Sequence, residues 1–350
     1  MTPKTLTELH KRNRGKVSDK WSFYLDKYER LFNPLRDKTI SLFEIGIQNG
    51  GSLEVWSKYF PRAKVFVGCD INKKCSKLTY QDPKINLVIG DANRRKIIKE
   101  VTQQGAPFDI VIDDGSHRSG DIIKSFINYF PHLADNGLYV IEDLHCSYWE
   151  KFEGGLFAPY SSMTFFKQIT DLINYQHWGV SRDYTEILKG FSVQYDLKLK
   201  QDVLEKIESI EFSNSMCIIR KSSGKPSGLG LRLVYGKDNV VSDAEKKVNL
   251  TKSIPIPQVN NVFSKKTLPP AEEVILLDQK IQTQETKIQT QENLLKLMTS
   301  SRLWKLTRLL RLIKAQSKLF IKLIPNSIQI LKRYGGILAS AKKLNRRYKK

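Results

Sequence analysis

The sequence predicts an α/β fold built on a doubly wound, mostly parallel β-sheet. Between residues 39 and 141, short apolar runs alternate with segments of helical spacing, which is typical of repeated strand–helix units with right-handed crossovers. Several of these runs end abruptly in glycine or acidic residues, and the carboxyl ends of parallel strands form the ligand crevice of such sheets. The expected strands are 39–47, 64–68, 85–89, 109–112 and 138–141.

The residues on either side of the first strand are expected to be helical. Residues 1–40 are polar and aromatic, with a helical spacing that ends at Pro34, and they predict an N-terminal helical cap over the mouth of the sheet. Ser52 follows a glycine turn and is placed to cap the helix 53–59.

The elements after the fifth strand are expected to complete the domain. A helix is predicted over about 162–175, and an antiparallel hairpin of 207–212 with 216–220 closes the edge of the sheet. The α/β domain therefore spans 41–221. Residues 222–270 gain glycine, serine, lysine, asparagine and proline, which predicts a linker.

Glycines and acids after the first three strands predict an adenosine-binding site. Gly46 and Gly50 allow a tight turn and a close approach of the backbone to a ligand. Asp70 lies 24 residues beyond Gly46, where an acid can hold ribose hydroxyls, and Asp91 would meet the adenine amino group or another polar ligand edge. The ExGxxxG spacing that begins at Glu44 departs from GxGxxG and disfavours NAD.

The fourth and fifth strands both run into acidic residues, one group of which includes a histidine. These residues are Asp113, Asp114, His117, Glu142 and Asp143. Clustered carboxylates raise one another's pKa, and a divalent cation would relieve their repulsion, so the sequence predicts a metal-assisted active site. Taken singly, the first acid pair would also suit a helix N-cap, the histidine a packing role and the second acid pair a solvated strand end. Their position on adjacent strand ends favours the functional interpretation.

Residues 271–300 are expected to form a helix. The repeat IQTQETK–IQTQENL places Val274, Ile281, Ile288 and Leu295 on one seam, while glutamines weaken the other row of the seam. A short oligomerising coiled coil and a solitary spacer helix therefore both stay open.

Residues 301–350 form a basic tail with fifteen lysines and arginines and no acid. Its first part has a regular apolar face with Trp304 near the start, which predicts binding to an anionic membrane surface. The tail holds most of the net charge of +22, so the first 300 residues are only mildly basic. Because their acid cluster would repel phosphate, a nucleic-acid partner is disfavoured.

Cysteine usage and hydropathy bear on location. The cysteines, Cys69, Cys75, Cys146 and Cys217, have no metal-ligand spacing. With no apolar signal segment at the N-terminus and no run of 18 apolar residues, we expect reduced thiols in a cytoplasmic protein that is peripheral to the inner face of the membrane.

Four segments resemble motifs of a known family. EIGIQNGGSLEVW, GCDIN, DDGSH and IEDLHCSYW are similar to the macrocin O-methyltransferase family of S-adenosylmethionine-dependent enzymes, whose wider relatives include cephalosporin hydroxylase-like proteins. The resemblance covers about residues 18–221, including the lead-in DKWSFYLDKYERLF. It implies a class I methyltransferase (Rossmann-like) fold, S-adenosylmethionine and Mg²⁺ as cofactors, and a sugar hydroxyl as acceptor.

The resemblance also implies roles for single residues. The metal ligands would be Asp114, Glu142 and Asp143, and the general base would be His117. The cofactor would be held by Glu44, Gly46, Gly50, Asp70, Asp91 and Asp113. Beside these, His145 is a second candidate base, and Tyr148 and Trp149 are candidate acceptor contacts because they lie nearest the metal in sequence.

The implied chemistry is consistent with these residue types. A sugar hydroxyl needs a Lewis acid to stabilise its alkoxide and a base near neutral pH to accept its proton. We therefore expect Mg²⁺-dependent methyl transfer from S-adenosylmethionine to a sugar, with a bacterial cell-surface glycan as first candidate and a small macrolide-type metabolite as the alternative. A non-catalytic scaffold that binds partner helices through 271–350 is the interpretation from another class.

Overall fold

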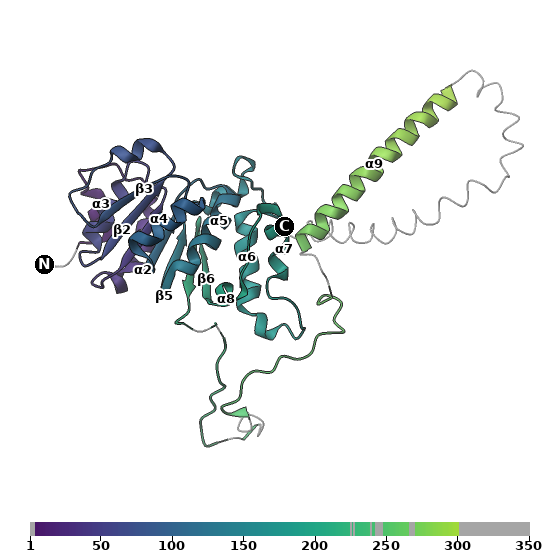
Figure 1. Ribbon diagram of the computed structural model, residues 1–350. Helices are drawn as coiled ribbons and strands as arrows, with labels where there is room; N and C mark the ends of the chain where they lie inside the picture. Colours follow the sequence, from purple (N-terminus) through teal and green to yellow (C-terminus); the bar gives the residue numbers. More distant parts are fainter. Residues whose placement is uncertain are drawn as a thin grey trace, which may run out of the picture. The chain divides into compact units, whose positions relative to one another are not determined.

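The protein is described by a computed structural model that covers residues 4–300 apart from 225, 227, 239, 242–247 and 266–269. Within this part a seven-stranded sheet has the order β3-β2-β1-β4-β5-β7-β6 (Figure 1). Its strands are β1 Ser41–Ile45, β2 Val65–Asp70, β3 Ile85–Ile89, β4 Phe108–Asp113, β5 Leu133–Ile141, β6 Ile207–Ser213 and β7 Met216–Lys221. The first five are parallel, and β7 runs antiparallel to both β5 and β6. The predicted doubly wound sheet with its C-terminal antiparallel hairpin is confirmed.

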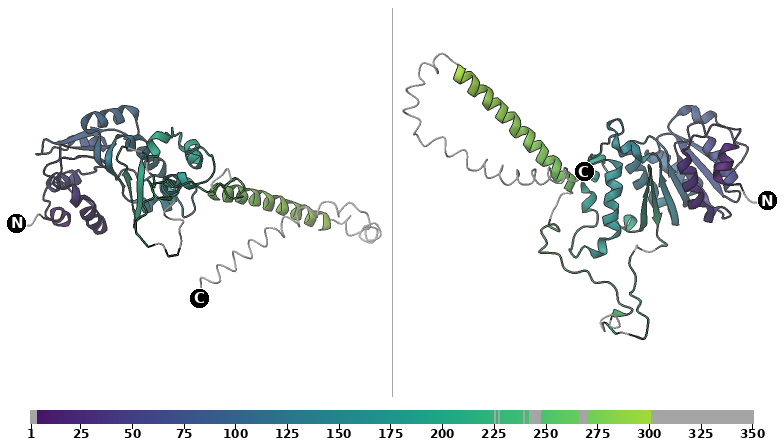
Figure 2. Two further views of the ribbon diagram at one scale, coloured as in Figure 1. Left: turned by 90° about the horizontal axis from the view of Figure 1, so that it is seen from below. Right: turned by 180° about the vertical axis from the view of Figure 1, so that it is seen from behind.

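Helices cover both faces of the sheet. They are α1 Leu6–Lys11, α2 Ser22–Phe32, α3 Gly51–Tyr59, α4 Arg95–Gly105, α5 Ser119–Tyr129, α6 Ser162–Ile173, α7 Lys189–Tyr195 and α8 Gln201–Leu204. Successive strand residues point to opposite faces, so Leu42 packs in the layer of α2 and α3, and Phe43 packs in the layer of α4, α5 and α6. The latter helices lie in front of the sheet in Figure 1, and the purple N-terminal helices lie in front when it is seen from behind (Figure 2).

The predicted elements are confirmed with changes at their ends. β5 begins earlier than predicted, because a bulge between Phe108 and Ile110 lets Leu133 pair with Phe108. The prediction that Ser52 caps a helix is wrong. α3 begins at Gly51, two residues before the predicted start, and the Ser52 hydroxyl donates to Glu44 Oε2 at 2.7 Å. The side chain is drawn inward because the Glu44 carboxylate is fully buried and needs hydrogen-bond donors.

The N-terminal helical segment packs on the α3 face of the sheet. The buried residues of α2 recur at helical spacing, as Tyr24, Tyr28 and Phe32. The rings of Tyr28 and Phe32 meet Trp56 of α3 with centroids 5.3 and 5.8 Å apart. As a result, the chain just before α2 is carried to the carboxyl ends of the strands.

The C-terminal part is described separately. α9 spans Pro270–Ser300, and its described residues from 274 on belong to a different unit from the described residues before them. Ile281, Ile288 and Leu295 are each about half exposed along this helix, so the coiled coil stays a prediction. The predicted basic tail, residues 301–350, lies outside the described residues. Among the helices that are described, none combines the length and the apolar character needed to cross a membrane.

Candidate active site

β1 ends in a turn that requires glycine. Gly46 has a φ of +83°, and a Cβ at this position would lie 2.0 Å from the carbonyl oxygen of Asp114. The Gly46 N–H donates to the carbonyl of Cys69 at 2.8 Å, which fixes the turn between the ends of β2 and β4. Backbone from two strands thus meets here without any intervening side chain.

Two adjoining cavities lie at the carboxyl ends of the strands, with volumes of about 440 and 180 Å³. Gly46 and Asp70 line both of them, and Asp91 and Asp113 line the smaller one. The Asp70 carboxylate accepts hydrogen bonds from the backbone N–H groups of Ile47, Gln48 and Asn72 at 3.1, 2.9 and 2.8 Å. The predicted adenosine-binding acids therefore face the two cavities at the glycine turn.

The side chains of Asp113 and Asp114 point in different directions, because successive residues along a strand alternate between the two faces of the sheet. Asp113 is buried and accepts long hydrogen bonds from the Gly115 N–H and the Tyr139 hydroxyl, at 3.4 and 3.5 Å. Burial, above all, raises the pKa of its carboxyl group to about 7. Asp114 lines the larger cavity instead. Neither acid caps α5, which begins at Ser119 without a side-chain cap.

The Lys20 ammonium group lies among three of the acids. It donates to Asp114 Oδ2 and to Glu142 Oε1, the latter at 2.8 Å, and lies 3.6 Å from Glu44 Oε1. Burial opposes its charge, but the three carboxylates outweigh this and hold the Lys20 pKa well above its usual range. Glu142 Oε1 also accepts from the Tyr28 hydroxyl at 2.6 Å. Burial raises the pKa of Glu142, and Lys20 opposes that rise.

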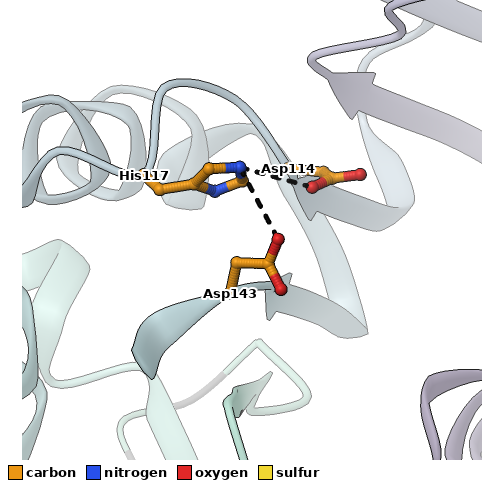
Figure 3. Close-up of side chains that lie close together, drawn as sticks. All are labelled: Asp114, His117 and Asp143. Carbon is orange, nitrogen blue, oxygen red and sulfur yellow. Dashed lines mark ion pairs between the residues drawn. The ribbon is translucent and has the colours of Figure 1, made fainter. Parts of the chain in front are cut away.

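The outer edge of the larger cavity brings together Asp114, His117 and Asp143 (Figure 3). His117 Nε2 lies 3.9 Å from Asp114 Oδ1 and 3.7 Å from Asp143 Oδ2. Both His117 and Asp143 have left-handed backbone conformations, with φ of 57° and 50°. Such conformations are uncommon outside glycine, and here they turn two polar side chains toward the same point.

This edge fits a divalent cation. One ligand atom from each of Asp114, His117 and Asp143 lies within 4.8 Å of the others, and hard cations such as Mg²⁺ prefer carboxylate oxygens. The predicted carboxylate set is brought together only in part. Glu142 lines the same cavity, but its Oε1 is engaged by Lys20 and lies apart from that convergence.

The remaining predicted residues lie around this edge. Gly50 lines neither cavity and accepts a hydrogen bond from the Tyr80 hydroxyl at 3.1 Å. His145 Nδ1 bonds with the hydroxyl of Ser215 and lies 3.8 Å from Asp143 Oδ1. Tyr148 and Trp149 are partly exposed and line neither cavity, and the Trp149 ring packs edge-on against His145 at 5.0 Å. Their acceptor role stays a prediction.

The N-terminal residues of the site were not predicted individually. They are Lys20, Trp21, Tyr24 and Tyr28, each of which donates to an acid of the cluster. The available signal was the four-residue spacing of the two tyrosines, which predicts a shared helix face but not its partner. The partner acids lie about a hundred residues further along the chain, beyond the reach of any local pattern.

The fold defines the class: the mixed sheet and its strand order are those of a class I methyltransferase. No family model matches the sequence. Curated relatives do match. The 8-demethyl-8-α-L-rhamnosyl tetracenomycin-C 2′-O-methyltransferase of Streptomyces olivaceus is 36% identical over 171 residues, which are 46% of this chain and 44% of the relative.

Two other relatives agree with this one. The demethylmacrocin O-methyltransferase of Streptomyces fradiae is 33% identical over 50% of this chain and 46% of its own. A solved structure of MycE methyltransferase from the mycinamycin biosynthetic pathway, in complex with Mg, SAH and mycinamycin VI, is 26% identical with a TM-score of 0.51. That likeness covers 63% of this chain and 56% of the other. The resemblance to sugar O-methyltransferases is confirmed, and the chain matches about half the length of these relatives or less.

Proposed function

We propose that this protein is an S-adenosylmethionine- and Mg²⁺-dependent O-methyltransferase that acts on a sugar hydroxyl. The observation that carries the proposal is the convergence of Asp114, His117 and Asp143 on the edge of a cavity that begins at the Gly46 turn. A cofactor cavity lined by acids and an edge suited to a cation are the two parts that such a transfer needs.

Different residues of the chain would bind the cation, accept the proton and hold the cofactor. Asp114 and Asp143 would hold the cation through the oxygens that face His117, whereas Glu142, the third ligand expected from the sequence, is engaged by Lys20 and Tyr28. A bound Mg²⁺ would supply Lewis acidity that stabilises an alkoxide. His117 Nε2 would accept the hydroxyl proton, because it lies 3.9 and 3.7 Å from the two carboxylates and therefore beside the position proposed for the cation and the hydroxyl. Asp70 and Asp91 would hold the cofactor's ribose and adenine edges.

The acceptor is proposed to be the sugar of a small glycoside. The relatives named above are methyltransferases of glycosylated natural products, among them a rhamnosyl tetracenomycin and demethylmacrocin. This supports a macrolide-type glycoside as the acceptor. None of the relatives named above acts on a cell-surface glycan by its name. Membrane binding by residues 301–350 and self-association through residues 271–300 remain separate proposals.

The test compares the two histidines next to Asp143. His117→Ala should lower kcat for the formation of S-adenosylhomocysteine by about 10²–10⁴-fold, the usual contribution of a general base. Titration calorimetry should find its affinity for S-adenosylhomocysteine unchanged. His145→Ala is the matched control, since its imidazole is occupied by Ser215. The assay uses aryl rhamnosides as acceptors, with Mg²⁺ or with a chelator.

The outcomes separate the alternatives. Normal turnover by His117→Ala would show that the base has been misassigned. Turnover that survives the chelator would remove the cation from the proposal. If neither small glycosides nor isolated surface polysaccharide is methylated although the cofactor binds, the scaffold interpretation gains over the enzymatic one.

A further inference from the structure

The carboxylates at the edge of the cavity are each held on one side only. Asp114 Oδ2 accepts from Lys20, whereas its Oδ1 faces His117. Asp143 is divided in the same way: Oδ1 accepts from the Trp21 indole N–H at 3.1 Å and from the Tyr24 hydroxyl at 2.8 Å, and Oδ2 faces His117. The segment Lys20–Tyr24 thus engages one carboxylate oxygen of each acid. The other oxygen of each acid is left directed at His117.

Tyr24 contacts Asp143 twice. Besides its bond to Oδ1, the Tyr24 hydroxyl accepts a hydrogen bond from the Asp143 backbone N–H at 3.1 Å. Asp143 needs such support because its backbone is left-handed, with φ 50° and ψ 33°. A single hydroxyl therefore fixes both the backbone conformation and the side-chain rotation of this aspartate.

The hydroxyl is itself fixed in place. Tyr24 is 2% exposed, and its ring is packed in the layer between α2 and the sheet. Its oxygen also lies 2.7 Å from the Ser215 hydroxyl, which belongs to the turn between β6 and β7. Because the ring cannot swing, the bond to Asp143 restricts a carboxylate that would otherwise rotate at the cavity edge.

We propose that Tyr24, assisted by Trp21, is a positioning residue for the cation: it turns Asp143 so that Oδ2 is presented beside Asp114 Oδ1. This inference rests on the proposed function, because it requires that a cation binds at this edge. Groups that orient metal-binding carboxylates without touching the metal typically change metal affinity by about 10–100-fold when they are removed. The N-terminal segment would then be part of the metal site as well as a cover for the sheet.

The experiment measures metal affinity rather than activity. Mn²⁺ is titrated into the full-length protein without S-adenosylmethionine, and binding is followed by calorimetry and by the loss of the free Mn²⁺ signal in electron paramagnetic resonance. Tyr24→Phe removes the hydroxyl and keeps the ring. Tyr59→Phe is the matched control, because Tyr59 is equally buried in the same layer but its hydroxyl bonds to Glu29, at 3.3 Å.

We expect Tyr24→Phe to raise the Kd for Mn²⁺ by about 10–100-fold, while Tyr59→Phe, which removes a buried hydroxyl away from the cavity, leaves it within about twofold. Thermal unfolding of both variants is measured alongside, and both should remain folded at the titration temperature, which separates positioning from general destabilisation. Trp21→Phe removes the second donor to the same oxygen from a ring that is 63% exposed, so folding is not at risk. It should weaken Mn²⁺ binding as well, by less than Tyr24→Phe does.

Two failures would have different meanings. If the unmodified protein binds Mn²⁺ and Tyr24→Phe and Trp21→Phe bind it equally well, the positioning role is refuted and the proposed function stands. If the unmodified protein does not bind Mn²⁺ while it still binds S-adenosylhomocysteine, the cation is removed from the proposed function and the inference is refuted with it.

Discussion

Lys20→Met should be strongly destabilising, because it removes the cation from the inner acids while nearly preserving the length of the side chain. The Lys20 side chain is 4% exposed, and its ammonium lies 2.8 Å from Glu142 and 3.6 Å from Glu44, besides its bond to Asp114. Because the site is buried, water cannot solvate the carboxylates in place of the ammonium group. Removing one partner of a buried ion pair typically costs about 3–5 kcal/mol, which is the loss in free energy of unfolding that we expect near pH 8.

The loss of stability caused by Lys20→Met should depend on pH. Without Lys20, Glu142 and Glu44 would relieve their repulsion by binding protons, and this becomes easier as pH falls. For a carboxyl group whose pKa is raised in the folded state, each pH unit below that pKa increases the free energy of unfolding by about 1.4 kcal/mol. The increase ends where the unfolded chain also binds the proton. We therefore expect the effect of Lys20→Met to be smaller near pH 5.5 than near pH 8 by about 1–2 kcal/mol.

The assay is guanidinium unfolding followed by near-ultraviolet circular dichroism, with a chelator present, at the two pH values. Lys16→Met is the matched control: Lys16 lies in the same segment and pairs with Glu54 at 2.8 Å, but both side chains are partly exposed. Such pairs contribute about 0–1 kcal/mol. The reasoning is refuted if the two variants lose equal stability, or if Lys20→Met costs more near pH 5.5 than near pH 8.

Two further predictions concern Asp113 and Gly46. The Asp113 pKa is raised from 3.8 to about 7, so the folded protein holds a proton that the unfolded chain releases, and the stability of the metal-free protein should fall as pH rises across that interval. Asp113→Asn should flatten this slope in unfolding measured at successive pH values, and an unchanged slope would contradict the assignment. Gly46→Ala should lower the free energy of unfolding by more than about 2 kcal/mol, since the new Cβ would meet the Asp114 carbonyl in a left-handed backbone. Its control, Gly155→Ala, meets only Ala158 at 3.5 Å and should change stability by less than about 0.5 kcal/mol in the same denaturation experiment.

The sequence predicted the sheet because each strand carries its own signal. The runs that became β1 to β5 are mainly apolar, and the residues that end them are glycine or acids, so the position of the site followed from strand direction alone. The hairpin of β6 and β7 followed from alternation around a polar turn. Local patterns of this kind do not depend on distant partners.

The inner part of the site could not be predicted because its contacts are non-local. Lys20 lies 94 residues before Asp114 and 122 before Glu142, and Tyr24 lies 119 before Asp143. Helical spacing placed Tyr24 and Tyr28 on one face, but it could not tell a face that packs on apolar side chains from one that also donates to buried acids. The cap predicted for Ser52 was wrong for a different reason: its hydroxyl donates to the buried carboxylate of Glu44, on the preceding strand, and the residue lies inside α3 rather than before it.

The acids of the site are not equivalent, although in sequence they form two similar pairs. Strand alternation buries Asp113 on one face of the sheet, where a raised pKa favours its neutral form, and directs Asp114 to the other. Lys20 and Tyr28 then engage Glu142, and Tyr24 and Trp21 engage Oδ1 of Asp143. The uncompensated charge is thereby concentrated on the oxygens of Asp114 and Asp143 that face His117, which is where both a cation and a proton acceptor are useful to the same hydroxyl. A cluster of acids becomes a directed site because the N-terminal segment engages the oxygens of Asp114 and Asp143 that do not face His117.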